Sequence, residues 1–231
     1  MRIYRGSNLT LEDDYSVLEN IIQDTIEHNE IAIRVWQPPK HLAFGKRDIN
    51  HPNYEIVKEI ARDQAFPPRE RRVGGRAVPY TGETVAFMKV IPVSDFREGI
   101  QDRYDECLTD LQQALWRLGV PVLRGEPADS FCPGSHSLSY NGKIAGLAQR
   151  VRMDVAIVGG LIVVSHQDEF SGILKAIYPK LDLTFDPTSV GSIAAAGGTT
   201  NWDRIQSTLE EKLTHASEPT VIDLSKNLSS Q

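Results

Sequence analysis

Two cysteines are the strongest candidate nucleophiles in the chain, and their sequence surroundings differ. A cysteine that performs chemistry must be partly exposed and must lie near groups that favour the thiolate. Cys107 falls within a helical apolar stripe, so we expect a buried, inert side chain. Cys132 lies in a Pro/Gly loop, Phe131-Cys132-Pro133-Gly134, with His136 and Lys143 close by. Cys132 is therefore the candidate catalytic thiol.

Two polar residues that follow Cys132 could assist it. Lys143 comes directly after an Asn141-Gly142 turn and opens a strand that contains Gly146. Glycine lets a ligand approach the backbone closely, so the lysine can hold a carbonyl, a phosphate or a carboxylate. The alternative is a solvated lysine at the mouth of a hairpin. His136 is either a general base or an ordinary surface histidine.

A glycine pair preceded by arginines forms a second candidate ligand site. Arg71-Arg72-Val73 leads into Gly74-Gly75, whose N–H groups can cradle an anionic or carbonyl-bearing ligand while arginine supplies charge. The sequence contains no phosphate-loop or dinucleotide fingerprint, no paired cysteine spacing and no clustered His/Glu pattern. We therefore predict that the chain binds no metal and no dinucleotide cofactor.

Composition narrows the class of protein. The 231 residues are 40% hydrophobic and 24% charged, which predicts a globular domain with a sizeable core. No apolar run approaches the roughly 20 residues that span a bilayer, and no secretory segment opens the chain, so we expect a cytoplasmic protein with no membrane contact and free thiols. The net charge of −6 argues against nucleic-acid binding. A local cluster of arginines indicates a small anion or an acidic protein partner: Arg69, Arg71, Arg72 and Arg76.

Hydrophobic periodicity predicts the elements that position these residues. Helices are expected at 10–29, capped by Thr10, and at 53–65, 99–118, 168–177 and 201–215. Strands are expected at 31–36, 41–44, 84–91, 137–140, 143–152 and 155–164. Separate helices and meandering strands are typical of an α+β fold. We expect a single domain over residues 1–217 and a loosely ordered tail over 218–231.

Three blocks, taken in order, resemble the biotin/lipoate protein ligase superfamily. The family's glycine-rich block, Arg-Arg-x-Ser-Gly-Gly-Gly-Ala-Val, is matched by Arg71, Gly74, Gly75, Ala77 and Val78. Its second block, Gly-Lys-Lys-Ile-x-Gly-Ser-Ala-Gln, is matched by Lys143, Gly146, Ala148 and Gln149, and the strands that follow form the third. The stretch 131–150 and Asp186-Pro187 resemble the branch of cysteine-dependent octanoyltransferases and lipoyl amidotransferases.

The resemblance implies a central mixed β-sheet flanked by helices, the class II synthetase-like catalytic fold. It also implies transfer of an octanoyl or lipoyl group to a lysine of a lipoyl-carrier protein, such as the glycine cleavage H protein or an E2 lipoyl domain. In this interpretation Cys132 forms an acyl thioester, Lys143 polarises the acyl carbonyl, and no cofactor is required. The substrate site then comprises Arg71, Gly74, Gly75, Arg76, Ala77, Gly146, Ala148 and Gln149.

Departures from the family pattern keep two alternatives open. Val73 replaces the usual serine, Arg76 replaces the third glycine, and residues 79–83 replace the usual continuation. One alternative is an ATP- and magnesium-dependent lipoate-protein ligase, in which Lys143 and Arg71 hold an acyl-adenylate. The other is a homologue that binds a carrier or an acyl group without turnover. Because a charged Arg76 lies beside the glycines, a substrate different from that of the family is a further alternative.

Overall fold

The computed structural model describes residues 1–6, 9–71, 75–152, 154–215 and 218–224. The helices are α1 (Leu11–His28), α2 (Lys46–Ile49), α3 (Tyr54–Asp63), α4 (Ile100–Arg117), α5 (Gln167–Ile177) and α6 (Trp202–Thr214), with 3-10 turns η1 (Tyr178–Leu181) and η2 (Pro187–Ser189). The strands are β1 (Arg2–Arg5), β2 (Ala32–Trp36), β3 (His41–Phe44), β4 (Pro68–Glu70), β5 (Val78–Tyr80), β6 (Thr84–Pro92), β7 (Leu123–Arg124), β8 (Ser137–Ser139), β9 (Lys143–Val151), β10 (Val155–Val163) and β11 (Thr220–Asp223).

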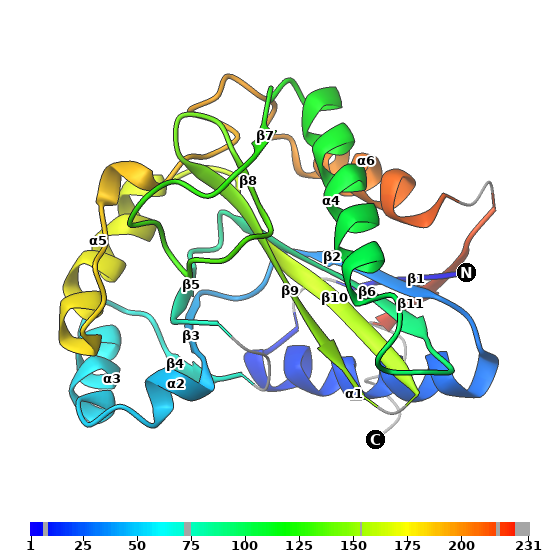
Figure 1. Ribbon diagram of the computed structural model, residues 1–231, viewed down its shortest axis with the longest axis horizontal. Helices are drawn as coiled ribbons and strands as arrows, with labels where there is room; N and C mark the ends of the chain where they lie inside the picture. The colour runs from blue at the N-terminus through cyan, green and yellow to red at the C-terminus, as the bar shows by residue number, and fades with distance from the viewer. Residues whose placement is uncertain (7–8, 72–74, 153, 216–217, 225–231) are drawn as a thin grey trace.

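Two sheets organise the chain. The large sheet has the strand order β11-β1-β2-β6-β10-β9-β8-β7, and the small sheet has the order β4-β3-β5. In the large sheet β1 runs parallel to β11 and β2, whereas the pairs from β2 to β7 are antiparallel. This mixed sheet with flanking helices confirms the predicted α+β class (Figure 1).

Helices cover both faces of the large sheet. Because successive strand side chains alternate between faces, Val158 and Ile162 of β10 pack with α4 and α6. Ile157 and Leu161 point to the opposite face. That face is covered by α1 beside Ile157, and by α5 with the small sheet beside Leu161. The two coverings approach each other over the middle of β6, β10 and β9, where the pocket described below lies.

Local signals explain the first helix and the central hairpin. Thr10 caps α1 as predicted: its hydroxyl accepts from the Asp13 N–H, and its own N–H donates to the Asp13 carboxylate. Asn141 and Gly142 both have positive φ angles, of 49° and 118°, as a tight hairpin turn requires. This turn sets where β9 begins, and so fixes Lys143 at the start of the strand.

The main difference from the sequence prediction lies at the C-terminal end. Residues 220–223 were expected to be loosely ordered, but they form β11 and pair in parallel with β1. Exposed and half-exposed side chains on this short edge strand give no apolar pattern that a sequence could reveal. Among the helices of the described ranges, none combines the length and the apolar composition needed to cross a bilayer.

Candidate active site

Cys132 lies in a turn between β7 and β8 that is fixed by contacts from distant elements. Its backbone adopts a left-handed conformation, with φ 41°, which is uncommon for a residue with a side chain. The Cys132 N–H donates to the Tyr178 hydroxyl at 2.9 Å, and that hydroxyl donates to the Ala77 carbonyl at 2.8 Å. Burial raises the pKa of Tyr178, so the hydroxyl stays protonated and can make both bonds. Tyr178 thus joins the Cys132 loop to the segment that follows the glycine pair.

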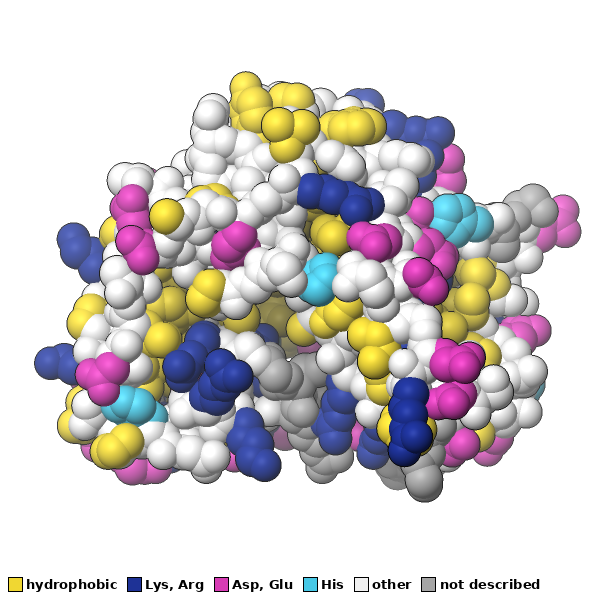
Figure 2. All heavy atoms as spheres, in the orientation of Figure 1, with side chains coloured by type: hydrophobic (Ala, Val, Ile, Leu, Met, Phe, Trp, Pro, Cys, Tyr) yellow, Lys and Arg dark blue, Asp and Glu magenta, His cyan; other side chains and the backbone are white. Residues whose placement is uncertain are grey.

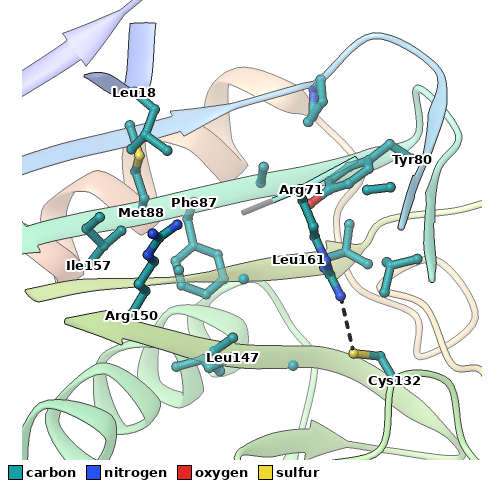
Figure 3. A pocket seen from close by; sticks show the side chains of 18 of the residues that line it. Leu18, Arg71, Tyr80, Phe87, Met88, Cys132, Leu147, Arg150, Ile157 and Leu161 are labelled. Carbon is teal, nitrogen blue, oxygen red and sulfur yellow. Dashed lines mark hydrogen bonds between the residues drawn. The ribbon is translucent and has the colours of Figure 1, made fainter. Parts of the chain in front are cut away.

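Positive and polar groups surround the Cys132 sulfur. The Arg76 backbone N–H donates to Sγ at 3.3 Å, and Arg71 Nη2 donates to it at 3.7 Å (Figure 3). Arg71 is held in place because the same Nη2 donates to the Arg76 carbonyl at 2.5 Å. Gly75 is required at this point: with φ 98°, an added Cβ would lie 2.7 Å from Sγ. The sulfur is thus partly exposed and faces hydrogen-bond donors from two residues.

Lys143 lies behind the same loop and is almost completely buried, with 1% of its surface exposed. Its Nζ donates to the Phe131 carbonyl at 2.9 Å, the Cys132 carbonyl at 3.1 Å and Glu126 Oε1 at 3.0 Å. Glu126 in turn accepts from the Ser130 and Ser137 hydroxyls. These acceptors match the three N–H donors of an ammonium, so Lys143 fixes the loop carbonyls next to the nucleophile.

An apolar pocket of about 570 Å³ runs from Cys132 along the large sheet. Cross-strand register builds its floor: Gly146 lies opposite Leu161, and Ala148 opposite Gly159, which pairs with Met88. Small residues in this row leave open space above the sheet. Figure 3 shows Cys132 at one end and Leu18, Met88 and Ile157 at the other, and Figure 2 shows hydrophobic side chains inside the hollow. Such a slot suits an extended acyl chain.

A buried ion pair forms part of the pocket wall. Arg34 of β2, 1% exposed, approaches Asp14 of α1 at 2.6 Å, and the Trp36 indole N–H donates to Asp14 at 3.0 Å. The Arg34 guanidinium also lies 4.3 Å above the Trp36 ring centroid. Sequence reasoning missed this group, although Arg34 is the single charge in an otherwise apolar segment, 31–36, and that charge was the available signal.

Two histidines also line the pocket. His41 stacks on Tyr80 with ring centroids 4.4 Å apart, and its Nδ1 lies 2.7 Å from the Pro39 carbonyl. His136 stacks on Tyr104, with centroids 3.6 Å apart. Burial lowers the pKa of both histidines, which favours neutral imidazole rings. His136 therefore lies in the pocket, which a general base for this site must do. Nothing in the sequence singled out His41.

The structure brings together most of the residues predicted for the substrate site. Arg71, Gly146 and Ala148 line the pocket with Cys132 and Lys143. Gly75 and Arg76 contact the thiol through their backbone, and Ala77 is buried in the core behind them. Gly74 lies outside the described residues, as do Arg72 and Val73.

Gln149 and the Arg76 side chain lie away from the pocket. Because side chains alternate along β9, Gln149 faces α4, where its Nε2 donates to the Ile100 carbonyl at 2.9 Å and its Oε1 accepts from Arg103 at 2.6 Å. The Arg76 guanidinium is directed to the buried Asp48 of α2 at 3.1 Å. An arginine therefore replaces the usual glycine without filling the substrate slot.

Cys107 has the opposite surroundings. It is 1% exposed in the core between α4 and the sheet, and burial raises the pKa of its thiol to about 12. The prediction that Cys107 is buried is confirmed, and its inertness stays a prediction. Nearby, Glu106, Asp110 and His215 bring potential ligand atoms within 4.8 Å of one another. The Lys89 ammonium donates to Glu106 at 2.7 Å, and the His215 ring nitrogen lies 2.9 Å from the Asp110 carboxylate.

Comparison with known proteins agrees with this geometry. The lipoyl protein ligase A/B catalytic domain family matches residues 12–214. An octanoyl-[GcvH]:protein N-octanoyltransferase from an Exiguobacterium species is 30% identical over 177 residues, covering 75% of this chain and 62% of the relative. A lipoyl-[GcvH]:protein N-lipoyltransferase from Listeria monocytogenes is 26% identical, covering 64% of this chain and 54% of the relative. The chain therefore spans about half to three-fifths of these relatives' lengths.

Solved structures show the same fold. Lipoate-protein ligase A bound with ATP aligns with a TM-score of 0.73 at 16% identity, covering 98% of this chain and 91% of that chain. Since the family match extends over most of the chain, the superfamily resemblance stated from the sequence is confirmed. The chain belongs to the lipoyl protein ligase A/B catalytic domain family.

Proposed function

We propose that this chain is an acyltransferase that moves an octanoyl or lipoyl group onto a carrier-protein lysine through a thioester at Cys132. One observation carries the proposal: a partly exposed thiol receives hydrogen bonds from Arg76 N–H and Arg71 at the end of an apolar slot. The names of the relatives pair an octanoyl- or lipoyl-GcvH donor with a protein acceptor, which supports a transfer between two carriers.

The proposed reaction has two acyl-transfer steps. In the first, the Cys132 thiolate attacks the acyl carbonyl of the donor; the bond from that carbon to the donor lysine nitrogen breaks, and the released amine takes a proton. In the second, the amine of an acceptor lysine attacks the thioester, a new amide forms, and the thiol is regenerated. Neither step needs ATP, because the acyl group enters already bound to a carrier.

The pocket residues have separate tasks in this proposal. Arg71 and the Arg76 N–H stabilise the thiolate before attack and after its release. Lys143 holds the loop by the Phe131 and Cys132 carbonyls, so its three donors position the nucleophile rather than contact the acyl carbonyl. Gly146 and Ala148 leave room for the chain.

The alternative is an ATP-dependent ligase, in which Arg71 and Lys143 hold an acyl-adenylate. Arg71 and Lys143 both line the same pocket, which places two positively charged side chains near a bound phosphate in this alternative. In that reaction Cys132 is dispensable and free lipoate or octanoate is the substrate.

A transfer assay separates the two functions. Purified chain is mixed with octanoylated donor carrier and unmodified acceptor carrier, and the acceptor is followed by mass spectrometry with and without ATP and magnesium. The acyltransferase proposal predicts full transfer without ATP and none with Cys132→Ala. Transfer by Cys132→Ala at the wild-type rate, or modification only from free octanoate and ATP, would establish the ligase instead.

A further inference from the structure

Helix α2 places two exposed cations beside the active site, Lys46 and Arg47. The connection to the thiol is short. Gly45, which precedes α2, packs so closely on the Gly75 carbonyl that an added Cβ would overlap it, and Gly75 itself contacts the Cys132 sulfur. The residue that precedes α2 therefore packs against Gly75, which in turn lies beside the Cys132 sulfur.

The charge on the outer side of α2 is not neutralised by its own acidic residue. Asp48 is fully buried and is used internally: its Oδ1 accepts from Arg76 at 3.1 Å, and its Oδ2 accepts from the Gly45 N–H at 3.1 Å. Among the ion pairs of the described residues, none includes Lys46 or Arg47. Two exposed cations, with no ion-pair partner among the described residues, thus lie on the helix that follows the Gly45–Gly75 contact.

This local charge contrasts with the whole molecule, whose net charge is −6. Figure 2 shows Lys and Arg side chains gathered over α2 next to the hollow. In an acidic chain, such a concentration of positive charge at the entrance to a site attracts a negatively charged partner and repels other basic surfaces. A free fatty acid does not need it, since the acyl chain binds inside an apolar slot.

We propose that Lys46 and Arg47 dock the acidic surface around the acylated lysine of the carrier protein. The inference rests on the proposed function, in which a carrier presents its acyl group to Cys132. When the acyl chain occupies the slot, the carrier body stays outside and covers the rim of the hollow, where Figure 2 shows Lys and Arg side chains. Cations at this rim accelerate the encounter and set which face of the carrier approaches, without contacting the acyl group.

The test reverses the two charges. Lys46→Glu/Arg47→Glu is expected to lower kcat/KM for the acylated carrier by about tenfold at low salt, through the rise in KM, while kcat at saturating carrier changes less than twofold. High salt should shrink the difference between the variant and wild type, because it screens exposed charges. An octanoyl thioester of a small thiol, which has no carrier surface, should acylate both proteins at the same rate.

A matched control removes the effect of net charge. Lys175→Glu/Arg204→Glu changes the net charge by the same amount at exposed positions on α5 and α6. It should keep the wild-type kcat/KM, and Lys46→Gln/Arg47→Gln should give an intermediate loss. Equal losses in the α2 and control reversals, or no loss in either, would overturn the docking site. If wild type is acylated by neither carrier nor small thioester, the proposed acyltransferase function itself is overturned.

Discussion

Cys132 and Cys107 carry the same functional group in opposite surroundings. Cys107 is enclosed by the core, and burial raises the pKa of its thiol to about 12. Cys132 is partly exposed and accepts from an arginine and a backbone N–H. Sequence context alone distinguished the two, since an apolar helical stripe and a Pro/Gly loop predict burial and exposure. The donors at Cys132 come from residues more than fifty positions away, and no sequence pattern could reveal them.

Replacing Arg71 tests the thiolate directly. Arg71→Met keeps most of the side-chain volume but removes the donor at 3.7 Å from Sγ. Hydrogen bonds from a charged donor to an anion contribute about 1.5–3 kcal/mol, so alkylation of Cys132 by iodoacetamide at neutral pH should slow about tenfold. Mass spectrometry after tryptic digestion measures the rate. A rate equal to wild type would mean that the guanidinium does not stabilise the thiolate.

His41 makes stability depend on pH. Burial lowers the pKa of His41 below its usual value of 6.5, so the unfolded chain binds a proton more tightly than the folded one. This contribution is complete above pH 6.5 and is lost as the pH falls through the folded-state value. His41→Gln should therefore show a smaller drop in Tm between pH 7.5 and pH 5.5 than wild type. Thermal unfolding at both pH values checks this, and identical drops would refute it.

At the scale of elements, the nucleophile depends on three segments that meet only in the fold. The turn that carries Cys132 is held from one side by Tyr178 of η1 and from the other by Lys143 of β9, and Arg71 follows β4. The Tyr178 and Arg71 contacts span 46 and 61 positions of the chain, whereas Lys143 lies 11 positions from Cys132. The precision of the site therefore depends on the packing of the whole domain.

Tyr178→Phe removes two buried hydrogen bonds at once. The Cys132 N–H and the Ala77 carbonyl lose their partner, which should lower the free energy of unfolding by about 1–3 kcal/mol. The acylation rate should fall as well, because the left-handed Cys132 loses its anchor. Tyr54→Phe is the control, since its hydroxyl donates to Glu70 at 3.0 Å and does not contact the loop. Urea unfolding measures the free energy of unfolding, and a single-turnover assay measures the acylation rate. Equal losses of both quantities in the two variants would mean that the Tyr178 anchor has no role.

Neighbouring residues of β9 should respond in opposite ways. Ala148 faces the pocket and Gln149 faces α4. Ala148→Phe fills the slot, so acylation by an octanoyl thioester should fall at least tenfold, while acylation by an acetyl thioester persists because the chemistry near Cys132 is untouched. Gln149→Ala should keep both rates and lose only about 1 kcal/mol of stability with its hydrogen bonds. If Gln149→Ala lost octanoyl transfer and Ala148→Phe kept it, the assignment of Ala148 to the pocket face of β9 would be wrong.

The long elements and the short strands β3 and β8 were predictable, whereas the other short elements were not. Helices α1 and α4 and strands β6, β9 and β10 have enough residues for periodicity to show, and the predicted ranges agree within a few residues. Strands β4, β5 and β7 and helix α2 span two to four residues, too few for a pattern. Their existence depends on contacts with other segments of the fold. Strands β4 and β5 contribute residues to the pocket, and α2 carries Lys46 and Arg47.

At the scale of the whole molecule, the site lies where two coverings of one sheet approach each other. Helices α4 and α6 seal one face, whereas α1 and the small sheet with α5 share the other and enclose the pocket. The resemblance to a known family predicted this mixed sheet, and the family match confirms it. The Tyr178 anchor emerges only from the three-dimensional arrangement, because Tyr178 lies 46 positions from Cys132 and 101 from Ala77.

The central claim is that Cys132 carries the acyl group, and the intact mass of the protein tests it most directly. Wild type mixed with an octanoylated donor, without ATP and without acceptor, should gain one octanoyl group that hydroxylamine removes. Cys107→Ala, which also loses one thiol, should gain the same mass, and Cys132→Ala should gain none. An octanoyl adduct of equal amount on Cys132→Ala, or no adduct on wild type while transfer proceeds, would contradict the thioester mechanism.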